Sequence, residues 1–312
     1  MEPVLNVGLP VFAIILLGYM AGRFGVLGTA ATEAINAFVY YFALPPLLFQ
    51  ALARVPPADA FNGPFLAAYS GGVLGTFAIA MLAGVMVFRH RPAALVLQGM
   101  TTIFTNTGYM GVPLYLIAFG EQGVLPALIL TVYNGALVIG LTIVLIELDL
   151  RSGGEPLKIL GDVGLSIVKN PLLMAATAGV VTSAFAVPLP QSVVNFCTIL
   201  GNASGPAALF AMGLFLAGRR LTRAWAEIGW LTFLKMIVQP AIAWWLAFEV
   251  LKLEPFWAAS AVIMSALPVG STAFVIAQRY GVYVEEATSV TLITTVLSFV
   301  TVSVLLVWFG LG

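Results

Sequence analysis

The stretch "TNTGYMGVP" at residues 105–113 interrupts a segment that is otherwise apolar enough to cross a membrane. The residues "GMTTIF" precede it and "LYLIAF" follows it, whereas the stretch itself holds two threonines, an asparagine, two glycines and a proline. Proline removes a backbone donor and crowds the preceding helical turn. At bilayer depth, the backbone groups freed in this way must be satisfied by protein, water or a ligand. The stretch therefore predicts a broken membrane helix.

The composition of the whole chain supports a membrane location. Of 312 residues, 61% are hydrophobic and only 8% are charged, with a mean hydropathy of +1.06. Soluble domains carry roughly a quarter charged residues, so this chain is predicted to be an all-α integral membrane protein. Long apolar runs argue against an outer-membrane barrel. The net charge of zero gives no reason to expect a nucleic-acid partner.

Apolar runs of about 20 residues predict ten membrane spans. Lysine and arginine are concentrated in the odd-numbered connections, which hold ten of them, against two in the even connections and termini. Because cytoplasmic loops are enriched in these residues, we expect a multi-pass protein of a bacterial inner membrane with both termini outside the cytoplasm. The predicted spans cover residues 4–22, 31–53, 63–88, 93–119, 122–147, 167–187, 190–217, 226–251, 255–279 and 286–310.

Landmarks in the two halves of the chain suggest an inverted repeat. Pro10 and Pro171 are separated by 161 residues, Pro46 and Pro206 by 160, and Pro113 and Pro268 by 155. An odd number of spans per half would give the halves opposite orientations. We therefore predict a first repeat at residues 1–150, a cytoplasmic linker at 151–166 that either forms an interfacial helix or is unstructured, and a second repeat at 167–312.

The fourth and ninth spans are expected to be interrupted and to cross, as in many secondary transporters. The half-helices that begin at the two breaks would direct the positive ends of their dipoles toward the bilayer centre, which suits an anionic carboxylate. Ordinary proline kinks are the simpler alternative.

Enzyme and metal chemistry lack the residues they need. Cys197 is the only cysteine and His90 the only histidine, so neither a cysteine–histidine metal site nor a catalytic triad can be assembled, and no cofactor is expected. A cation/proton antiporter would be expected to carry a buried aspartate at the crossing, where the sequence has none. A coupling proton or sodium ion remains open, as does a sensor that binds an anion without moving it.

Several motifs resemble the auxin efflux carrier family, which includes plant PIN carriers and bacterial malonate or malate permeases. The matching stretches cover most of the chain in order. The resemblance implies ten helices in two inverted repeats, a scaffold and a transport domain assembled from both, elevator-type alternating access, and a homodimer that carries organic anions. The motifs are "NTGYMGVPL" (106–114), "KNPLL" (169–173), "AMGLFLAG" (211–218), "KMIVQP" (235–240) and "ALPVGSTAFVIAQRYGV" (266–282).

The resemblance implies that Asn106 contacts the substrate carboxylate, although its amide would also serve to cap a broken helix. The other residues predicted to line the crossing are Thr105, Thr107, Gly108, Gly270, Ser271 and Thr272, with Pro113, Pro268, Pro46 and Gly111 at the kinks. The hydroxyls of Ser271 and Thr272 favour a small dicarboxylate over an aromatic, auxin-like acid.

Polar residues in other spans are further candidates. Asn202 and Ser204 in the seventh span, and Tyr41 in the second, either face the substrate or line the interface between domains. Lys235 lies within the eighth span, where a charge is a functional hypothesis by default. Its ammonium could attract the anion, or its long stem could extend to the membrane surface.

Overall fold

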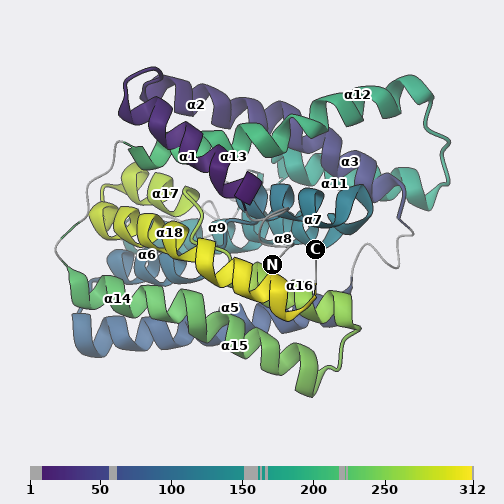
Figure 1. Ribbon diagram of the computed structural model, residues 1–312. Helices are drawn as coiled ribbons and strands as arrows, with labels where there is room; N and C mark the ends of the chain where they lie inside the picture. Colours follow the sequence, from purple (N-terminus) through teal and green to yellow (C-terminus); the bar gives the residue numbers. More distant parts are fainter. Residues whose placement is uncertain are drawn as a thin grey trace.

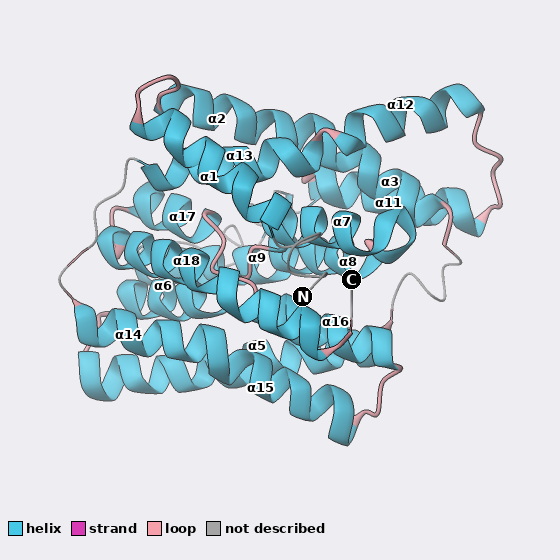
Figure 2. Cartoon of the chain, in the orientation of Figure 1, coloured by secondary structure: helices cyan, strands magenta, loops and turns pink. Residues whose placement is uncertain are grey.

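The computed structural model is helical in every named element (Figures 1 and 2). It describes residues 9–55, 62–150, 161, 164, 165, 168–217, 222 and 224–310. Among these residues the only β-type pairing is one isolated bridge between Thr105 and Val269. The predicted linker at 151–166 lies almost wholly outside the described residues.

Within the described ranges, six helices are long and apolar enough to cross a membrane, and four shorter apolar helices accompany them. The long helices are Ala30–Ala53, Gly63–Phe88, Leu125–Asp149, Gln191–Ala217, Trp225–Val250 and Val284–Trp308. The shorter ones are Leu9–Arg23, Pro92–Ile103, Pro171–Ala184 and Pro255–Ala266.

The helices form two layers, which we call the first and the second layer. The first, at the top of Figure 1, combines the beginning of the chain with its central part. It consists of α1 (Leu9–Arg23), α2 (Thr29–Phe38), η2 (Val39–Ala43), α3 (Leu44–Ala53), α11 (Pro171–Ala184), α12 (Gln191–Asn202) and α13 (Ser204–Ala217).

The second layer lies below the first in Figure 1 and contains both interrupted helices. Its N-terminal part consists of α5 (Gly63–Ala83), η3 (Gly84–Phe88), α6 (Pro92–Ile103), η4 (Thr107–Gly111), α7 (Val112–Gly123), α8 (Leu125–Tyr133), η5 (Asn134–Val138) and α9 (Ile139–Leu150). Its C-terminal part consists of α14 (Trp225–Phe233), η6 (Leu234–Val238), α15 (Gln239–Trp244), η7 (Trp245–Val250), α16 (Pro255–Ala266), α17 (Thr272–Tyr280) and α18 (Val284–Trp308).

Two glycines hold the first layer together by allowing helices to touch. A Cβ added to Gly18 on α1 would lie 2.1 Å from the carbonyl oxygen of Phe210 on α13. A Cβ on Gly179 of α11 would lie 2.7 Å from the carbonyl oxygen of Phe49 on α3. Small residues permit such close backbone approach between membrane helices. The two glycines are 161 residues apart, so α1 packs on α13 much as α11 packs on α3.

Three π-helical turns come directly before prolines. The elements η2, η4 and η6 are each followed by an α-helix whose second residue is Pro45, Pro113 or Pro240. A proline ring crowds the carbonyl four residues earlier, and the wider π turn accommodates it. Pro113 therefore follows a π turn inside a continuing helix, and the actual break lies earlier in the chain.

Candidate functional site

Two interrupted helices meet in the second layer through their extended segments. Helix α6 ends at Ile103 and α16 ends at Ala266. The Asn106 amide N–H donates to the Pro268 carbonyl at 2.9 Å, and the Gly270 N–H donates to the Phe104 carbonyl at 3.0 Å. Backbone groups that both helices leave unpaired are thus satisfied by each other, as the apolar surroundings require.

Local sequence explains where each helix stops. Leu267 precedes Pro268, and its backbone is extended, with φ −62° and ψ 152°, which is the region favoured before proline. A Cβ on Gly270 would lie 2.6 Å from the Phe104 ring and 3.4 Å from the Asn106 Cα, so only glycine fits this approach. Pro268 lies opposite the segment that begins at Phe104, since its carbonyl accepts from the Asn106 N–H; the predicted correspondence of Pro113 with Pro268 in two repeats stays a prediction.

Helices α8–α9 and α18 support the two breaks from behind. The Asn134 amide donates to the Thr107 hydroxyl at 3.3 Å, to the Thr105 carbonyl at 3.5 Å and to the Tyr69 hydroxyl at 3.2 Å. On the other break, the Thr294 hydroxyl accepts from the Val269 N–H at 3.1 Å. Sequence reasoning missed both residues, although the 160 residues between them repeat the spacing of the paired prolines Pro46 and Pro206.

Lys235 ties a neighbouring helix to both breaks. Its side chain is fully buried, and Nζ donates at 2.8 Å each to the Thr105 hydroxyl, the Gln239 side-chain oxygen and the Ser265 carbonyl. The alternative that Lys235 extends to the membrane surface is therefore wrong. These three acceptors are all neutral oxygens.

The Asn106 side chain points away from the helix that it was expected to cap. Its amide nitrogen lies 3.2 Å from the Met212 sulfur on α13, and the residue is 3% exposed. The backbone carbonyl of Asn106, not its side chain, accepts from the N–H groups of Met110 and Gly111. These are ordinary first bonds of the helix, and the Asn106 side chain makes no capping hydrogen bond. The amide itself faces the first layer, where a thioether is only a weak acceptor.

Most residues predicted to line the crossing are gathered there. Thr105, Thr107 and Gly270 are buried, while Gly108, Ser271 and Thr272 are half-buried. Gly111 is also buried, and a Cβ there would lie 3.0 Å from the Leu267 side chain.

The candidates from the second and seventh spans lie elsewhere. Tyr41 is 59% exposed and packs on Tyr40, and Asn202 is exposed. Ser204 is buried, but its hydroxyl donates to the Gly201 carbonyl of its own segment. Pro46 lies in α3, outside the break. Next to Ser204, a Cβ on Gly205 would be 3.4 Å from Pro113.

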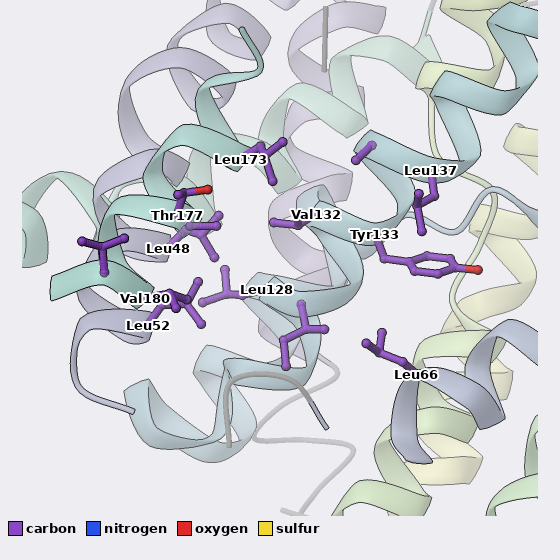
Figure 3. Close-up of a pocket in the computed structure, with 14 residues that line it drawn as sticks. Leu48, Leu52, Leu66, Leu128, Val132, Tyr133, Leu137, Leu173, Thr177 and Val180 are labelled. Atoms are coloured by element: carbon purple, nitrogen blue, oxygen red, sulfur yellow. The ribbon is translucent and has the colours of Figure 1, made fainter. Parts of the chain in front are cut away.

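Two open cavities lie where the layers meet. The first, of about 330 Å³, is a groove in which leucines and valines of α3, α8 and α11 point toward one another (Figure 3). The second, of about 640 Å³, lies between α3 and the α7–α8 junction, and Gln50 and Arg54 give it polar lining.

A second polar cluster joins two connections and the start of α14 at one end of the second layer. His90 Nε2 lies 2.7 Å from the Glu227 carboxylate, which also accepts from the Tyr283 hydroxyl. Burial, followed by the nearby Glu227 charge, raises the pKa of the Tyr283 hydroxyl above its ordinary range. The cluster fastens the α5–α6 and α17–α18 connections to the start of α14.

Comparison with known proteins identifies the family of the chain. Residues 3–306 match the family described as "Membrane transport protein". The chain is 32% identical to a putative malonate transporter of Rhizobium meliloti (strain 1021), over 98% of this chain and 96% of the relative. It is 27% identical to an uncharacterized transporter of Escherichia coli (strain K12), over 94% and 93% of the two chains.

A more distant similarity extends to plants. Auxin efflux carrier component 5 of Arabidopsis thaliana is 25% identical over 89% of this chain and 88% of its own length. With its apolar helices and these relatives, the chain belongs to the membrane transport protein family that includes the auxin efflux carriers, and it is a membrane transporter rather than an enzyme.

Proposed function

We propose that this transporter moves a small organic carboxylate, preferably a dicarboxylate, and binds it beside the paired breaks. The observation that carries the proposal is the Asn106 amide, which is buried at the junction of the layers with a thioether as its neighbour. An amide donates hydrogen bonds without adding a charge, which suits an anion that must bind and then leave.

The half-helices that begin at the breaks add to this preference. Both η4 and α17 start beside the extended segments, and the first N–H groups of a helix attract anions. Thr107, Ser271 and Thr272 place hydroxyls at the same two starts. The putative malonate transporter among the relatives supports a dicarboxylate, while the plant relative supports the alternative of an auxin-like aromatic acid.

We further propose that the ten apolar helices form two inverted repeats of five, at residues 1–150 and 167–312, with crossing breaks. Each of the four shorter helices has a short partner in the other half: Leu9–Arg23 with Pro171–Ala184, and Pro92–Ile103 with Pro255–Ala266. The matching glycine contacts of α1 and α11, and the supports from Asn134 and Thr294, follow the same spacing. The bias of basic residues supports both termini outside the cytoplasm.

In this proposal the first layer is the scaffold and the second layer moves past it in an elevator-type cycle. The largely apolar groove between α3, α8 and α11 supports this division, since an apolar surface can slide without breaking polar contacts. A homodimer that joins the first layers of two copies, in a cell membrane, is part of the same proposal.

Counterflow into proteoliposomes tests the substrate. Vesicles loaded with unlabelled malonate should take up labelled malonate, with competition by malate and succinate but not by indole-3-acetate. A hydrogen bond to a charged group contributes about 1.5–3 kcal/mol, so Asn106→Ala should lower uptake roughly 10- to 100-fold. Asn202→Ala, at an exposed asparagine, is the matched control and should transport normally.

Each outcome has a distinct meaning. Competition by indole-3-acetate alone would favour the auxin-like alternative. If no acid competes, the organic-anion proposal fails. If Asn106→Ala transports as well as Asn202→Ala, the substrate lies elsewhere.

A further inference from the structure

We propose that Lys235 is a built-in cation, held where a coupling sodium ion would otherwise bind, and that transport therefore needs no sodium. This inference concerns the ion that accompanies the anion, so it rests on the proposed function for its consequence but not for its geometry.

The surroundings of Nζ resemble a cation site. Three oxygens, from Thr105, Gln239 and Ser265, lie 2.8 Å from the nitrogen. They come from the break after α6, from α15 and from the end of α16. An ammonium has three N–H donors and no acceptor, and each donor has one partner here. A hydroxyl, an amide oxygen and a main-chain carbonyl are also the neutral oxygen ligands that hard cations accept.

The position of the ammonium relative to the helix ends gives the electrostatic reason. Ser265 belongs to the last turn of α16, and Thr105 lies two residues beyond the end of α6. Helix C-termini carry about half a negative charge each, and in transporters such half-helix ends and unwound carbonyls coordinate coupling ions. Lys235 brings a positive charge to the C-terminal ends of both α6 and α16. The positive N-terminal ends of η4 and α17 remain available to the anion.

Lys235 is thus a positioning residue. It does not need to touch the substrate, because its bonds fix the Thr105 segment that precedes Asn106 and the end of the helix that precedes Pro268. The described part of the chain gives it no ionic partner within 4.0 Å, which leaves its charge to the helix ends.

The first experiment replaces the tethered cation with a free one. Lys235→Ala removes three methylenes and the ammonium, a fragment that propylammonium reproduces. Thermal unfolding of the purified variant is followed with propylammonium chloride, with n-propanol and with sodium chloride, each against choline chloride. Near tenfold saturation, propylammonium should raise the melting temperature of the variant by about 3 °C, and n-propanol should not. Lys169→Ala, at an exposed lysine, is the control and should respond to neither.

The comparison of propylammonium with n-propanol distinguishes binding of a cation from filling of the space left by the side chain. Equal stabilisation by propylammonium and n-propanol, or by neither, would overturn the proposal. Should Lys235→Ala not fold, wild-type protein decides the question: labelled malonate uptake and melting temperature should be the same in sodium chloride and choline chloride. Sodium-dependent uptake would overturn the built-in cation. Absence of any uptake, with propylammonium rescue intact, would instead overturn only the proposed substrate.

Discussion

Gly270→Ala is the sharpest test of the paired breaks. The added methyl group would lie 2.6 and 2.9 Å from two atoms of the Phe104 ring and 3.4 Å from the Asn106 Cα. Phe104 is only 7% exposed, so its ring has little room to turn aside. Overpacking of this kind costs about 1–3 kcal/mol. At roughly 2–4 °C per kcal/mol, the melting temperature should fall by about 2–12 °C.

The matched control is the same substitution at Gly229. A Cβ there meets nothing within 4 Å, and the residue lies inside α14. Alanine is about 1 kcal/mol better than glycine in a helix interior, so Gly229→Ala should raise the melting temperature by a few degrees. Both variants are measured by thermal unfolding in the same detergent.

A second substitution locates the strain. Phe104→Leu in the Gly270→Ala background removes the ring atoms that the new methyl group meets, and it should restore part of the lost stability. The coupling between the two changes should be about 0.5–3 kcal/mol, as for residues in contact. A Gly270→Ala protein as stable as wild type, or changes that are simply additive, would refute the close pairing of the two segments.

Three further changes test the support of the first break, the α1–α13 contact and the Tyr283–Glu227 cluster. Asn134→Leu leaves buried polar groups at the first break without their hydrogen-bond partner, and each such group costs about 1–3 kcal/mol. The melting temperature of the variant should therefore drop by several degrees without loss of expression. Gly18→Ala should cost about 3 kcal/mol, at the upper end for overpacking, because the methyl group meets the rigid Phe210 backbone. In thermal unfolding, its melting temperature should be lower than that of Gly270→Ala. The raised pKa of Tyr283 beside Glu227 means that the folded state holds its proton longer than the unfolded chain does. Stability should therefore fall as pH rises above about 10, the ordinary tyrosine value, and Tyr283→Phe should weaken that fall in a pH series of melting temperatures.

The breaks could be predicted from sequence because their causes are local. Glycine, proline and hydroxyl residues placed inside apolar runs mark the positions at 105–108 and 268–272, and the structure has extended backbone or helix starts there. Proline alone was a less certain marker. Pro113 is accommodated by the π turn η4 inside a continuing helix, so a proline can bend the chain at a distance from the true interruption.

The direction of polar side chains was much harder to predict. In a soluble helix the apolar stripe identifies the buried face, but a membrane helix is apolar toward both lipid and protein. For this reason Tyr41 and Asn202, which are exposed, were predicted as site candidates, whereas Asn134, which is buried behind the break, was missed. For the same reason, the sequence left two orientations of the Lys235 side chain possible, and only its hydrogen bonds to both breaks decide between them.

The differences between the proposed repeats indicate where the chemistry lies. The backbone pairing sets Asn106 opposite Pro268 and Gly270 opposite Phe104, so Asn106 and Gly270 hold equivalent places. One carries an amide directed at the first layer, while the other has no side chain because the Phe104 ring fills the space. Likewise, Lys235 stands 160 residues after Gly75, which has no charge to offer. The proposed duplication would account for two breaks with exchanged backbone bonds, and the Asn106 amide and the Lys235 ammonium are the features that depart from that symmetry. The proposed carboxylate site needs one such amide and the proposed built-in cation needs one such lysine, so both proposals agree with this asymmetry.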